Sequence, residues 1–262
     1  MRIMTLNVNG IRSAARKGLF DWLAKSGGDF LCLQEIKAQT DDLQADAAFS
    51  PKGWHAYFNP AQKKGYAGVA LFARQAPEAV LDRLGEREFD DEGRYLELRY
   101  GNLSIVSLYV PSGSAGPERQ ASKDRFLEFF LPKLREWIGN GRDYVICGDW
   151  NIAHTRKDLK NWRSNQKNSG FLPHERAWLD RVFGPVPAGL GWVDAYRALH
   201  PDAEGEAYTW WSNRGQAYAK NVGWRIDYQV ITPSLRGAVR AASVYKGTRF
   251  SDHAPLIVDY AL

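Results

Sequence analysis

The segment from Tyr144 to His154, YVICGDWNIAH, places two polar side chains directly after an apolar run. That run is rich in β-branched and aromatic residues, which predicts a buried strand. Asp149 and Asn151 follow two positions apart, and alternate residues of an extended chain point to the same side. We therefore expect this carboxylate and this amide to meet one common partner, while Trp150 between them points the other way into packing.

Other apolar runs also begin or end in side chains that could do chemistry. A single Asn or Asp at such a place is usually only a turn or a cap. Several together are different, because strand ends can converge on one edge and form a polar site on a rigid scaffold. The residues concerned are Asn7, Glu35, Tyr109, Asp227, Asp252 and His253.

The residue types at this edge restrict its chemistry. Carboxylate and amide oxygens suit a hard divalent cation such as Mg²⁺, whereas the cysteines and histidines are too few for a zinc cage. A metal ion can polarise a phosphoryl oxygen while a carboxylate takes the proton of an attacking water. The chain has neither a P-loop nor a Gly-x-Gly-x-x-Gly motif, which argues against a kinase or a dehydrogenase. Hydrolysis of a phosphate ester is therefore favoured.

Many strand-like runs with a few amphipathic helices must position these residues. Helices are predicted at about residues 15–25, 118–138 and 173–183, and the second has one apolar face. We expect two packed sheets covered by helices, in one domain spanning residues 1–262. The strands are too many for a simple doubly wound fold, and their alternation with helices is too irregular for an eight-fold barrel.

The charge balance suits a polyanionic partner. The formal net charge is +5, and two loop-like stretches, residues 156–167 and 211–225, carry an excess of Lys and Arg. No apolar run approaches the roughly 20 residues that span a bilayer, and no targeting segment is visible. We therefore expect an intracellular, cytoplasmic protein that makes no membrane contact, with Cys32 and Cys147 reduced and buried.

A series of short blocks resembles, in order, the signature blocks of the exonuclease III family of abasic-site endonucleases, in the endonuclease/exonuclease/phosphatase superfamily. The blocks are LNVNGIR, LQEIK, LYVPSG, GDWNIAH, NSGFLPHER, NVGWRIDY and SDHAPL, and they run from the first strand to the last. The resemblance implies a four-layered α/β sandwich, two mixed β-sheets flanked by helices. It also implies Mg²⁺-dependent cleavage 5′ to abasic sites in double-stranded DNA during base excision repair, with Mn²⁺ able to substitute. Further activities that it implies are 3′-to-5′ exonuclease and 3′-phosphodiesterase or phosphatase action on 3′ ends.

The resemblance assigns a metal site to the polar strand ends. Glu35 is similar to the principal metal ligand, Asn7 lies beside it, and Asp252 resembles a further ligand of the same ion. A second metal position is sometimes placed near Asp149, so one or two metal ions fit the resemblance. The whole implied set of metal-site residues is Asn7, Glu35, Asp149, Asn151, Asp252 and His253.

The same resemblance assigns catalytic roles. Asp149 is similar to the carboxylate that activates or orients the attacking water, and Asn151 to its amide partner. His253 resembles the histidine that hydrogen-bonds the scissile phosphate, and Asp227 the carboxylate that orients it. Tyr109 is similar to an active-site phenol, and whether Tyr109 or Asp149 activates the nucleophile stays open.

Substrate contacts are implied for a third set of residues: Asn161, Asn165, Asn168, Trp210, Arg214 and Trp224. Asn165 and Asn168 resemble groups that contact the DNA backbone and a flipped-out sugar. Trp210 and Trp224 resemble the walls of a pocket for a baseless deoxyribose, whereas Trp211 is expected in the core. Arg214 stands where a relative inserts an apolar side chain into the duplex, and an Arg is a poorer unstacking wedge.

Three residues depart from the pattern of some relatives. Asn9 stands in place of Asp, Trp210 in place of Phe, and Ser112 in place of Asn. We expect these changes to affect the balance between endonuclease and exonuclease activity and not the chemistry itself.

Two other hypotheses compete with a DNA-repair nuclease. One is a phosphoesterase of the same superfamily that acts on an inositol phosphate, a lipid or RNA, although the blocks NQKNSGF and NVGWRID are not expected there. The other is a DNA-binding protein that has lost catalysis, which is disfavoured because nearly every expected polar residue is present. Nothing in the sequence indicates an obligate oligomer, so we expect a monomer.

Overall fold

Two six-stranded sheets and one two-stranded sheet contain all the strands of the computed structural model, which describes residues 1–262. The strands are β1 (Arg2–Asn7), β2 (Phe30–Gln34), β3 (His55–Asn59), β4 (Val69–Ala73), β5 (Ala79–Leu81), β6 (Tyr95–Tyr100), β7 (Leu103–Tyr109), β8 (Asp143–Asp149), β9 (Val193–Asp194), β10 (Trp210–Trp211), β11 (Gly223–Trp224), β12 (Asp227–Ile231), β13 (Val239–Val244) and β14 (Leu256–Tyr260). The first sheet has the order β13-β14-β1-β2-β4-β3 and the second β5-β6-β7-β8-β12-β9. Both sheets are mixed, because β1–β2 and β7–β8 are parallel while their other neighbours are antiparallel.

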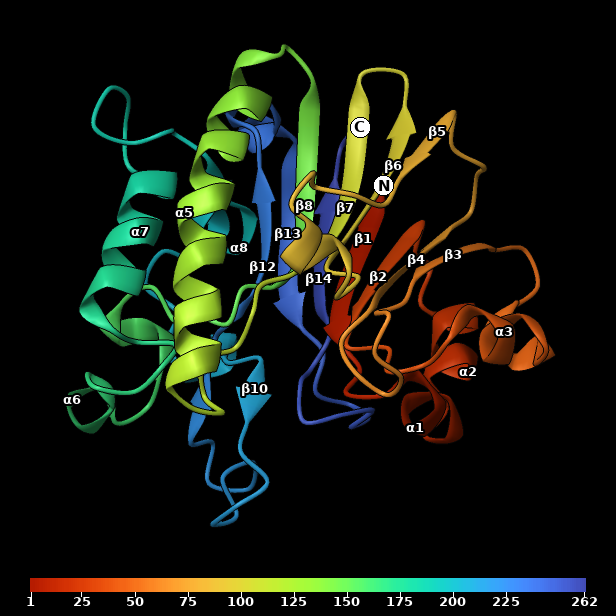
Figure 1. Cartoon of the computed structure of the whole chain (residues 1–262), viewed down its shortest axis with the longest axis horizontal. Coiled ribbons are helices and arrows are strands. Elements are labelled where there is room, and N and C mark those ends of the chain that lie inside the picture. Colours follow the sequence, from red (N-terminus) through yellow and green to blue (C-terminus); the bar gives the residue numbers. More distant parts are fainter.

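Helices cover the outer faces of both sheets. The α-helices are α1 (Ile11–Arg16), α2 (Leu19–Lys25), α3 (Thr40–Gln44), α4 (Arg87–Asp90), α5 (Pro117–Gly139), α6 (Trp162–Asn165), α7 (Pro173–Phe183) and α8 (Ala195–Leu199). Short 3₁₀ helices are η1 (Ala47–Phe49), η2 (Arg156–Asp158), η3 (Gly205–Ala207) and η4 (Pro233–Ala238). Figure 1 shows α1 to α3 on one flank and α5 and α7 on the other.

Alternate residues of the central strands contact different partners, and this alternation builds the layers. Ile3 of β1 and Val145 of β8 belong to one core cluster between the sheets. The next residue of β1, Met4, packs with α1 and α2, and the next residue of β8, Ile146, packs with α5 and α7. The predicted four-layered α/β sandwich is therefore confirmed.

The predicted helix at residues 15–25 is wrong in its bounds. The chain forms two short helices there, α1 and α2, because Gly18 adopts a left-handed backbone (φ 84°) that ends one helical segment before the next begins. The helices predicted at 118–138 and 173–183 are present as α5 and α7. Around Trp210 the chain forms only the two-residue strand β10.

The chain ends and the loops around β10 lie at opposite ends of the molecule (Figure 1). β1, β7 and β8 run toward the end that holds β10, so their carboxyl ends meet there. No helix has both the length and the apolar character needed to cross a bilayer.

Candidate active site

At the edge of the gap between the sheets, four strands begin or end in polar side chains that point the same way as the core residues of those strands. Asn7, Tyr109, Asp149 and Asp227 have the same parity in their strands as core residues of the central cluster: Ile3, Ile105, Val145 and Ile231. Tyr109 pairs with Asp149 across β7 and β8, and Asp227 pairs with Asp149 across β8 and β12. Strand register therefore brings together residues that are far apart in the sequence.

Asn7 connects two carboxylates that come from different sheets. Its Nδ2 donates to Glu35 Oε1 at 2.8 Å and to Asp149 Oδ2 at 2.9 Å. Its Oδ1 accepts the backbone N–H of Asn9 at 2.9 Å. In this arrangement the amide nitrogen of Asn7 faces the carboxylates, so Asn7 holds two candidate metal ligands in place.

Left-handed backbone conformations cluster at this end of the sheets. Non-glycine residues with positive φ include Asn9 (44°), Glu35 (51°), Lys37 (50°) and Asn151 (52°). Each such conformation costs about 1–3 kcal/mol and tends to persist at functional sites. At Asn151 it turns the chain so that the backbone N–H donates to Asp149 Oδ1 at 2.9 Å and Nδ2 donates to the Val110 carbonyl at 2.8 Å.

His253 and Asp227 form a buried pair beside Asp149. His253 Nδ1 lies 2.9 Å from Asp227 Oδ2, and His253 Nε2 lies 3.9 Å from Asp149 Oδ2. Burial alone would lower the pKa of His253, but the charge and hydrogen bond of Asp227, followed by Asp149 and Asp252, raise it to about 10. The imidazole is therefore protonated at neutral pH and can donate from Nε2 into the space beside Asp149.

The carboxylates of the site are electrostatically distinct. Burial and the charge of Asp227 raise the pKa of Asp149 to about 7. Burial would also raise the pKa of Glu35, but Lys37, whose Nζ lies 2.8 Å from Glu35 Oε2, together with Asn7 lowers it. Burial and Glu35 raise the pKa of Tyr109 well above its ordinary value, so this phenol is protonated.

Glu35, Tyr109, Asp149 and His253 line a pocket of about 250 Å³, which we call the strand-end pocket. Trp210 and Trp224 form one side of it as a cross-strand pair of β10 and β11, with ring centroids 6.2 Å apart in an edge-on arrangement. Trp210 Nε1 donates to Asp252 Oδ2 at 3.1 Å, which ties the aromatic side to the carboxylate side. The lining residues are Glu35, Tyr109, Ser112, Ser114, Asp149, Asn151, Asn168, Ser169, Gly170, Trp210, Trp224, Ile226, Asp252 and His253.

The residues predicted to contact substrate do not all lie in this pocket. Asn168 lines it and donates from Nδ2 to Asn165 Oδ1 at 2.8 Å. Asn165 and Arg214 line an adjoining groove of about 880 Å³ instead, which shares Asn168 and the tryptophan pair with the pocket. Asn161 lies outside both, on a separate basic surface with Arg156 and Arg163. Trp211 is buried in the core, as expected.

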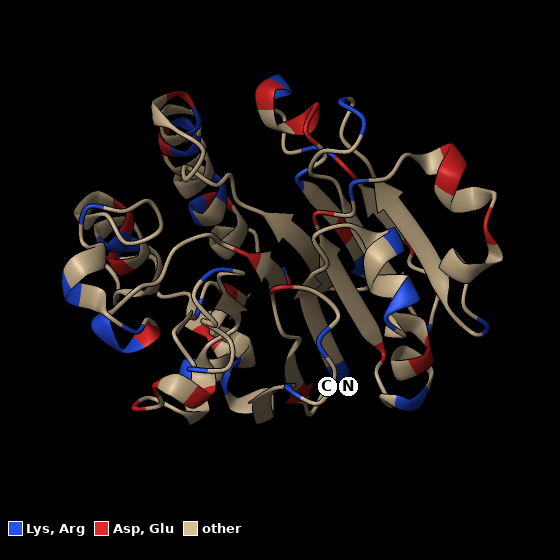
Figure 2. Ribbon diagram, turned by 90° about the horizontal axis from the view of Figure 1, so that it is seen from below, with Lys and Arg blue, Asp and Glu red and all other residues tan.

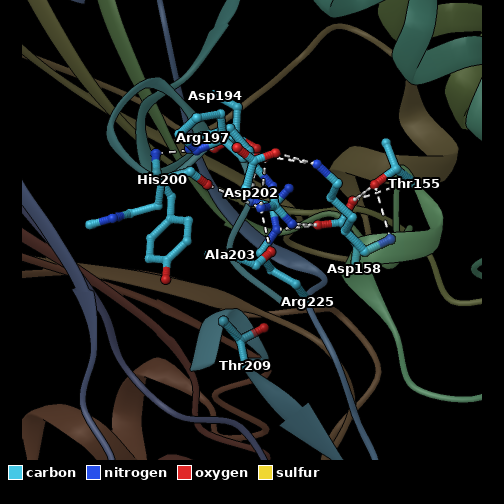
Figure 3. A network of polar contacts seen from close by, with 12 residues as sticks. Thr155, Asp158, Asp194, Arg197, His200, Asp202, Ala203, Thr209 and Arg225 are labelled. Atoms are coloured by element: carbon cyan, nitrogen blue, oxygen red, sulfur yellow. Dashed lines mark hydrogen bonds and ion pairs between the residues drawn. The ribbon is translucent and has the colours of Figure 1, made fainter. Parts of the chain in front are cut away.

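A buried ion-pair network holds the backbone between Trp224 and Asp227 (Figure 3). Asp158 Oδ1 lies 2.6 Å from Arg225 Nε and 2.6 Å from Arg197 Nη2. Asp158 Oδ2 accepts from the backbone N–H and the hydroxyl of Thr155, which caps η2. The network therefore fixes the basic loop after β8 against the strand that carries the aromatic side of the pocket.

Several residues of the site were missed by sequence reasoning. Lys37 lies in the block LQEIK, two positions after Glu35, and its Nζ also donates to Asn9 Oδ1 at 2.6 Å. Its spacing from Glu35 was a signal that could have identified it. Ser169 and Gly170 belong to the block NSGF, but nothing in their types predicted that they line the pocket.

Positive and negative side chains are interspersed around this end of the molecule. Figure 2, which views the chain from this end, shows Lys and Arg on helices and loops on both sides of the sheets, with Asp and Glu between them. Among the basic residues of the stretch 156–167, Lys157 pairs with Asp202 at 2.6 Å. Arg156, Lys160 and Arg163 line the basic surface around Asn161.

Comparisons with known proteins agree with this geometry. Residues 4–253 match the sequence profile described as the Endonuclease/Exonuclease/phosphatase family. The chain is 38% identical to an exodeoxyribonuclease of Bacillus subtilis over 98% of both chains. It is 35% identical to a DNA repair nuclease APEX1 of Danio rerio, over 100% of this chain and 83% of that protein. The structure of an AP endonuclease from Archaeoglobus fulgidus superposes with a TM-score of 0.89 at 28% identity and full coverage of both chains.

Proposed function

We propose a specific reaction for this chain, which belongs to the endonuclease/exonuclease/phosphatase family: Mg²⁺-dependent hydrolysis of the DNA backbone 5′ to an abasic site, in base excision repair. The observation that carries the proposal is the strand-end pocket itself, where carboxylates, a protonated His–Asp pair and two tryptophans meet. Related proteins named as an exodeoxyribonuclease, a DNA repair nuclease and an AP endonuclease support the choice of DNA. The same pocket would serve 3′-to-5′ exonuclease and 3′-end cleaning.

The donor set fits a divalent cation. Glu35, Asp149 and Asp252 bring three carboxylates to one pocket, and hard cations prefer such oxygen ligands. We propose that Glu35 and Asp252 hold Mg²⁺, with the remaining residues assigned from the sequence, Asn7, Asp149, Asn151 and His253, around it. When bound, the ion would supply charge stabilisation at the phosphate and a lowered pKa for a bound water. Mn²⁺ is expected to substitute.

Side chains of the pocket would bind the phosphate and accept the proton of the attacking water. His253 donates from Nε2 to a non-bridging phosphate oxygen, and Asp227 holds the ring in that orientation through Nδ1. Asp149 lies 3.9 Å from the same imidazole and can accept the proton of the attacking water. Tyr109 pairs with Asp149 across the strands and is the alternative group for this proton transfer.

The aromatic side of the pocket provides the preference for a missing base. A nucleotide must leave the base stack to reach a pocket at the strand ends, and extrusion costs least where no base is present. Trp210 and Trp224 would pack against the bare sugar. Asn168 would contact the neighbouring phosphate, and Asn165 and Arg214 would contact DNA along the adjoining groove.

The physical partner would be double-stranded DNA that contains abasic sites or 3′ ends. We propose that the protein acts as a monomer, with one catalytic domain over residues 1–262. We also propose an intracellular, cytoplasmic location.

Cleavage of end-labelled duplexes tests the proposal. One duplex carries a single abasic-site analogue, a second is intact, and each is incubated with Mg²⁺ or with EDTA. We expect one discrete Mg²⁺-dependent product from the damaged duplex. A ladder that shortens both duplexes equally from the 3′ end would show a general exonuclease. No cleavage of either, with turnover of an inositol phosphate, a lipid phosphoester or RNA, would favour the non-DNA phosphoesterase instead.

A further inference from the structure

A fully buried ion pair lies behind the strand-end pocket and has no part in the chemistry proposed above. Lys123 is on α5 and Glu175 is on α7, and Lys123 Nζ lies 2.6 Å from Glu175 Oε1. Both side chains are 0% exposed. Placing two charges in the interior costs several kcal/mol per ion, so a buried pair is weak evidence for stability as such. Its remaining contacts indicate what else it does.

Lys123 contacts the loop that carries Asp149 and Asn151. Its Nζ donates to the backbone carbonyl of Asn151 at 2.8 Å. Asn151 has a left-handed backbone there, and its N–H donates to Asp149 Oδ1. The Lys123 ammonium therefore holds the carbonyl of Asn151, and the N–H of the same residue orients the Asp149 carboxylate.

Glu175 contacts the loop that carries Asn168. Its Oε2 accepts the backbone N–H groups of Gly170 at 2.7 Å and of Leu172 at 2.9 Å. Gly170 (φ 91°) is close to the first loop, since a Cβ there would lie 3.1 Å from the Asn151 carbonyl and 3.2 Å from Trp224. The N–H of Ala153 also donates to the Gly170 carbonyl at 2.8 Å.

We propose that Lys123 and Glu175 are positioning residues that hold these two loops in register, so that Asp149, Asn151 and Asn168 face one substrate. The Lys123 ammonium contacts both the Glu175 carboxylate and the Asn151 carbonyl. The Glu175 carboxylate in turn accepts the backbone N–H groups of the loop that carries Asn168. Apolar side chains could fill the same volume, but they could not satisfy these buried peptide groups. This inference rests on the proposed function in one respect: cleavage of abasic DNA is the reaction by which the positioning is measured.

The test is a double variant, Lys123→Met/Glu175→Met, which keeps the volume of the pair and buries no unpaired charge. Its folding is checked by circular dichroism. We expect the single-turnover rate on the abasic duplex to fall about 10- to 100-fold, the range typical of a misplaced catalytic group. The dissociation constant for DNA in EDTA should change by less than about 5-fold, because basic residues such as Arg163 and Arg214 lie outside the two loops.

Two further variants separate positioning from general stability. Lys123→Arg keeps a donor toward the Asn151 carbonyl, and we expect it to retain most of the rate. Arg2→Met removes the ion pair with Asp259 (2.7 Å) at the other end of the sheets and should leave the rate unchanged. A folded double variant that cleaves at the wild-type rate would overturn the proposal, and so would an Arg2→Met variant as slow as the double one.

A second readout does not depend on activity. Hydrogen exchange measured by mass spectrometry should show faster exchange over residues 168–173 in the double variant than in the wild type, with α5 unchanged. Unaltered exchange there would contradict the positioning role even if the wild type cleaved no abasic DNA. If the wild type did not cleave the abasic duplex but the double variant still exchanged faster over residues 168–173, only the proposed function would be contradicted.

Discussion

At the scale of single residues, Asp149 is held through both of its carboxylate oxygens. Its Oδ1 accepts the Asn151 N–H, its Oδ2 accepts Asn7 Nδ2, and His253 lies 3.9 Å away. Burial and Asp227 keep its pKa near 7, well above that of an ordinary Asp. A carboxylate held in this way is suited to accept a proton at neutral pH.

The substitution Asp149→Asn tests this role. It keeps the size of the side chain and one acceptor oxygen but removes the proton acceptor. We expect turnover on the abasic duplex to fall by at least about 100-fold, the scale of general-base catalysis. DNA affinity in a gel-shift titration should be nearly unchanged. A parallel loss of affinity would mean that Asp149 contributes chiefly to binding.

The substitution Trp224→Ala tests the aromatic side of the pocket. It removes the surface against which a baseless sugar would pack, so we expect kcat/KM for the abasic duplex to fall by about 10- to 100-fold. Removal of nucleotides from an intact 3′ end should fall less. Trp22→Ala, a half-buried tryptophan on α2 that packs on Tyr245, is the matched control. Equal losses on both substrates would show that Trp224 does not distinguish them.

At the scale of elements, short irregular segments depend on buried charges for their position. β11 contains only two residues, and the chain beyond it is held by Arg225, whose Nε lies 2.6 Å from Asp158. Burial would raise the pKa of Asp158, but Arg225 and Arg197 lower it well below its ordinary value. The network therefore links η2, α8 and the start of β12.

Acid should remove this contribution to stability. A carboxylate whose folded-state pKa is lowered stabilises the fold above its unfolded pKa, about 3.9 for Asp, and loses that effect as the pH falls toward the folded value. We expect Asp158→Asn to cost about 3–5 kcal/mol near pH 7, because it leaves Arg225 buried without its charge partner. The difference from the wild type, measured by urea denaturation, should shrink below about pH 4. A difference that stays constant with pH would contradict the ion-pair account.

The sequence predicted the regular elements better than the contacts between them. The run YVICGD predicted a strand directly, because its β-branched and aromatic composition is a local property. Gly18 divided a predicted helix, since one left-handed residue outweighs the surrounding helical pattern. The Lys123–Glu175 pair was not predicted, because nothing local indicates that residues 52 positions apart in the chain meet in the interior.

The candidate site shows the same division. Polar residues at strand ends could be identified from the sequence. Strand register pairs Tyr109 with Asp149, and the packing of the two sheets brings Asn7 to Asp149. Asn161 lies outside the pocket, on the basic surface that includes Arg156 and Arg163, and its contact with substrate stays a prediction. Spacing along a loop does not determine on which side of that loop a residue lies.

At the scale of the whole molecule, the net charge of +5 and the adjoining groove predict electrostatic binding to DNA. Lys167 and Arg214 line that groove. The basic surface around Asn161 adds Arg156, Lys160 and Arg163. Each phosphate neutralised by such a residue releases counterions. We expect the logarithm of the affinity for duplex DNA to fall linearly with the logarithm of salt concentration, with a slope of about −3 to −5.

Fluorescence anisotropy in EDTA at several salt concentrations checks this slope. The double substitution Arg156→Gln/Arg163→Gln should make the slope shallower if the basic surface around Asn161 contacts phosphates. The matched control, Arg125→Gln on the outer side of α5, pairs with Glu88 and should not change it. A flat dependence for the wild type would mean that these loops are not the DNA surface.

We propose above that the strand-end pocket hydrolyses the phosphodiester on the 5′ side of an abasic site. The most direct measurement is the chemical identity of the new ends, determined by mass spectrometry of the cleaved abasic duplex. We predict a 3′-hydroxyl on the upstream fragment and a 5′-deoxyribose phosphate on the downstream fragment. An unsaturated sugar left on the 3′ end would show elimination on the other side of the lesion and would contradict the account.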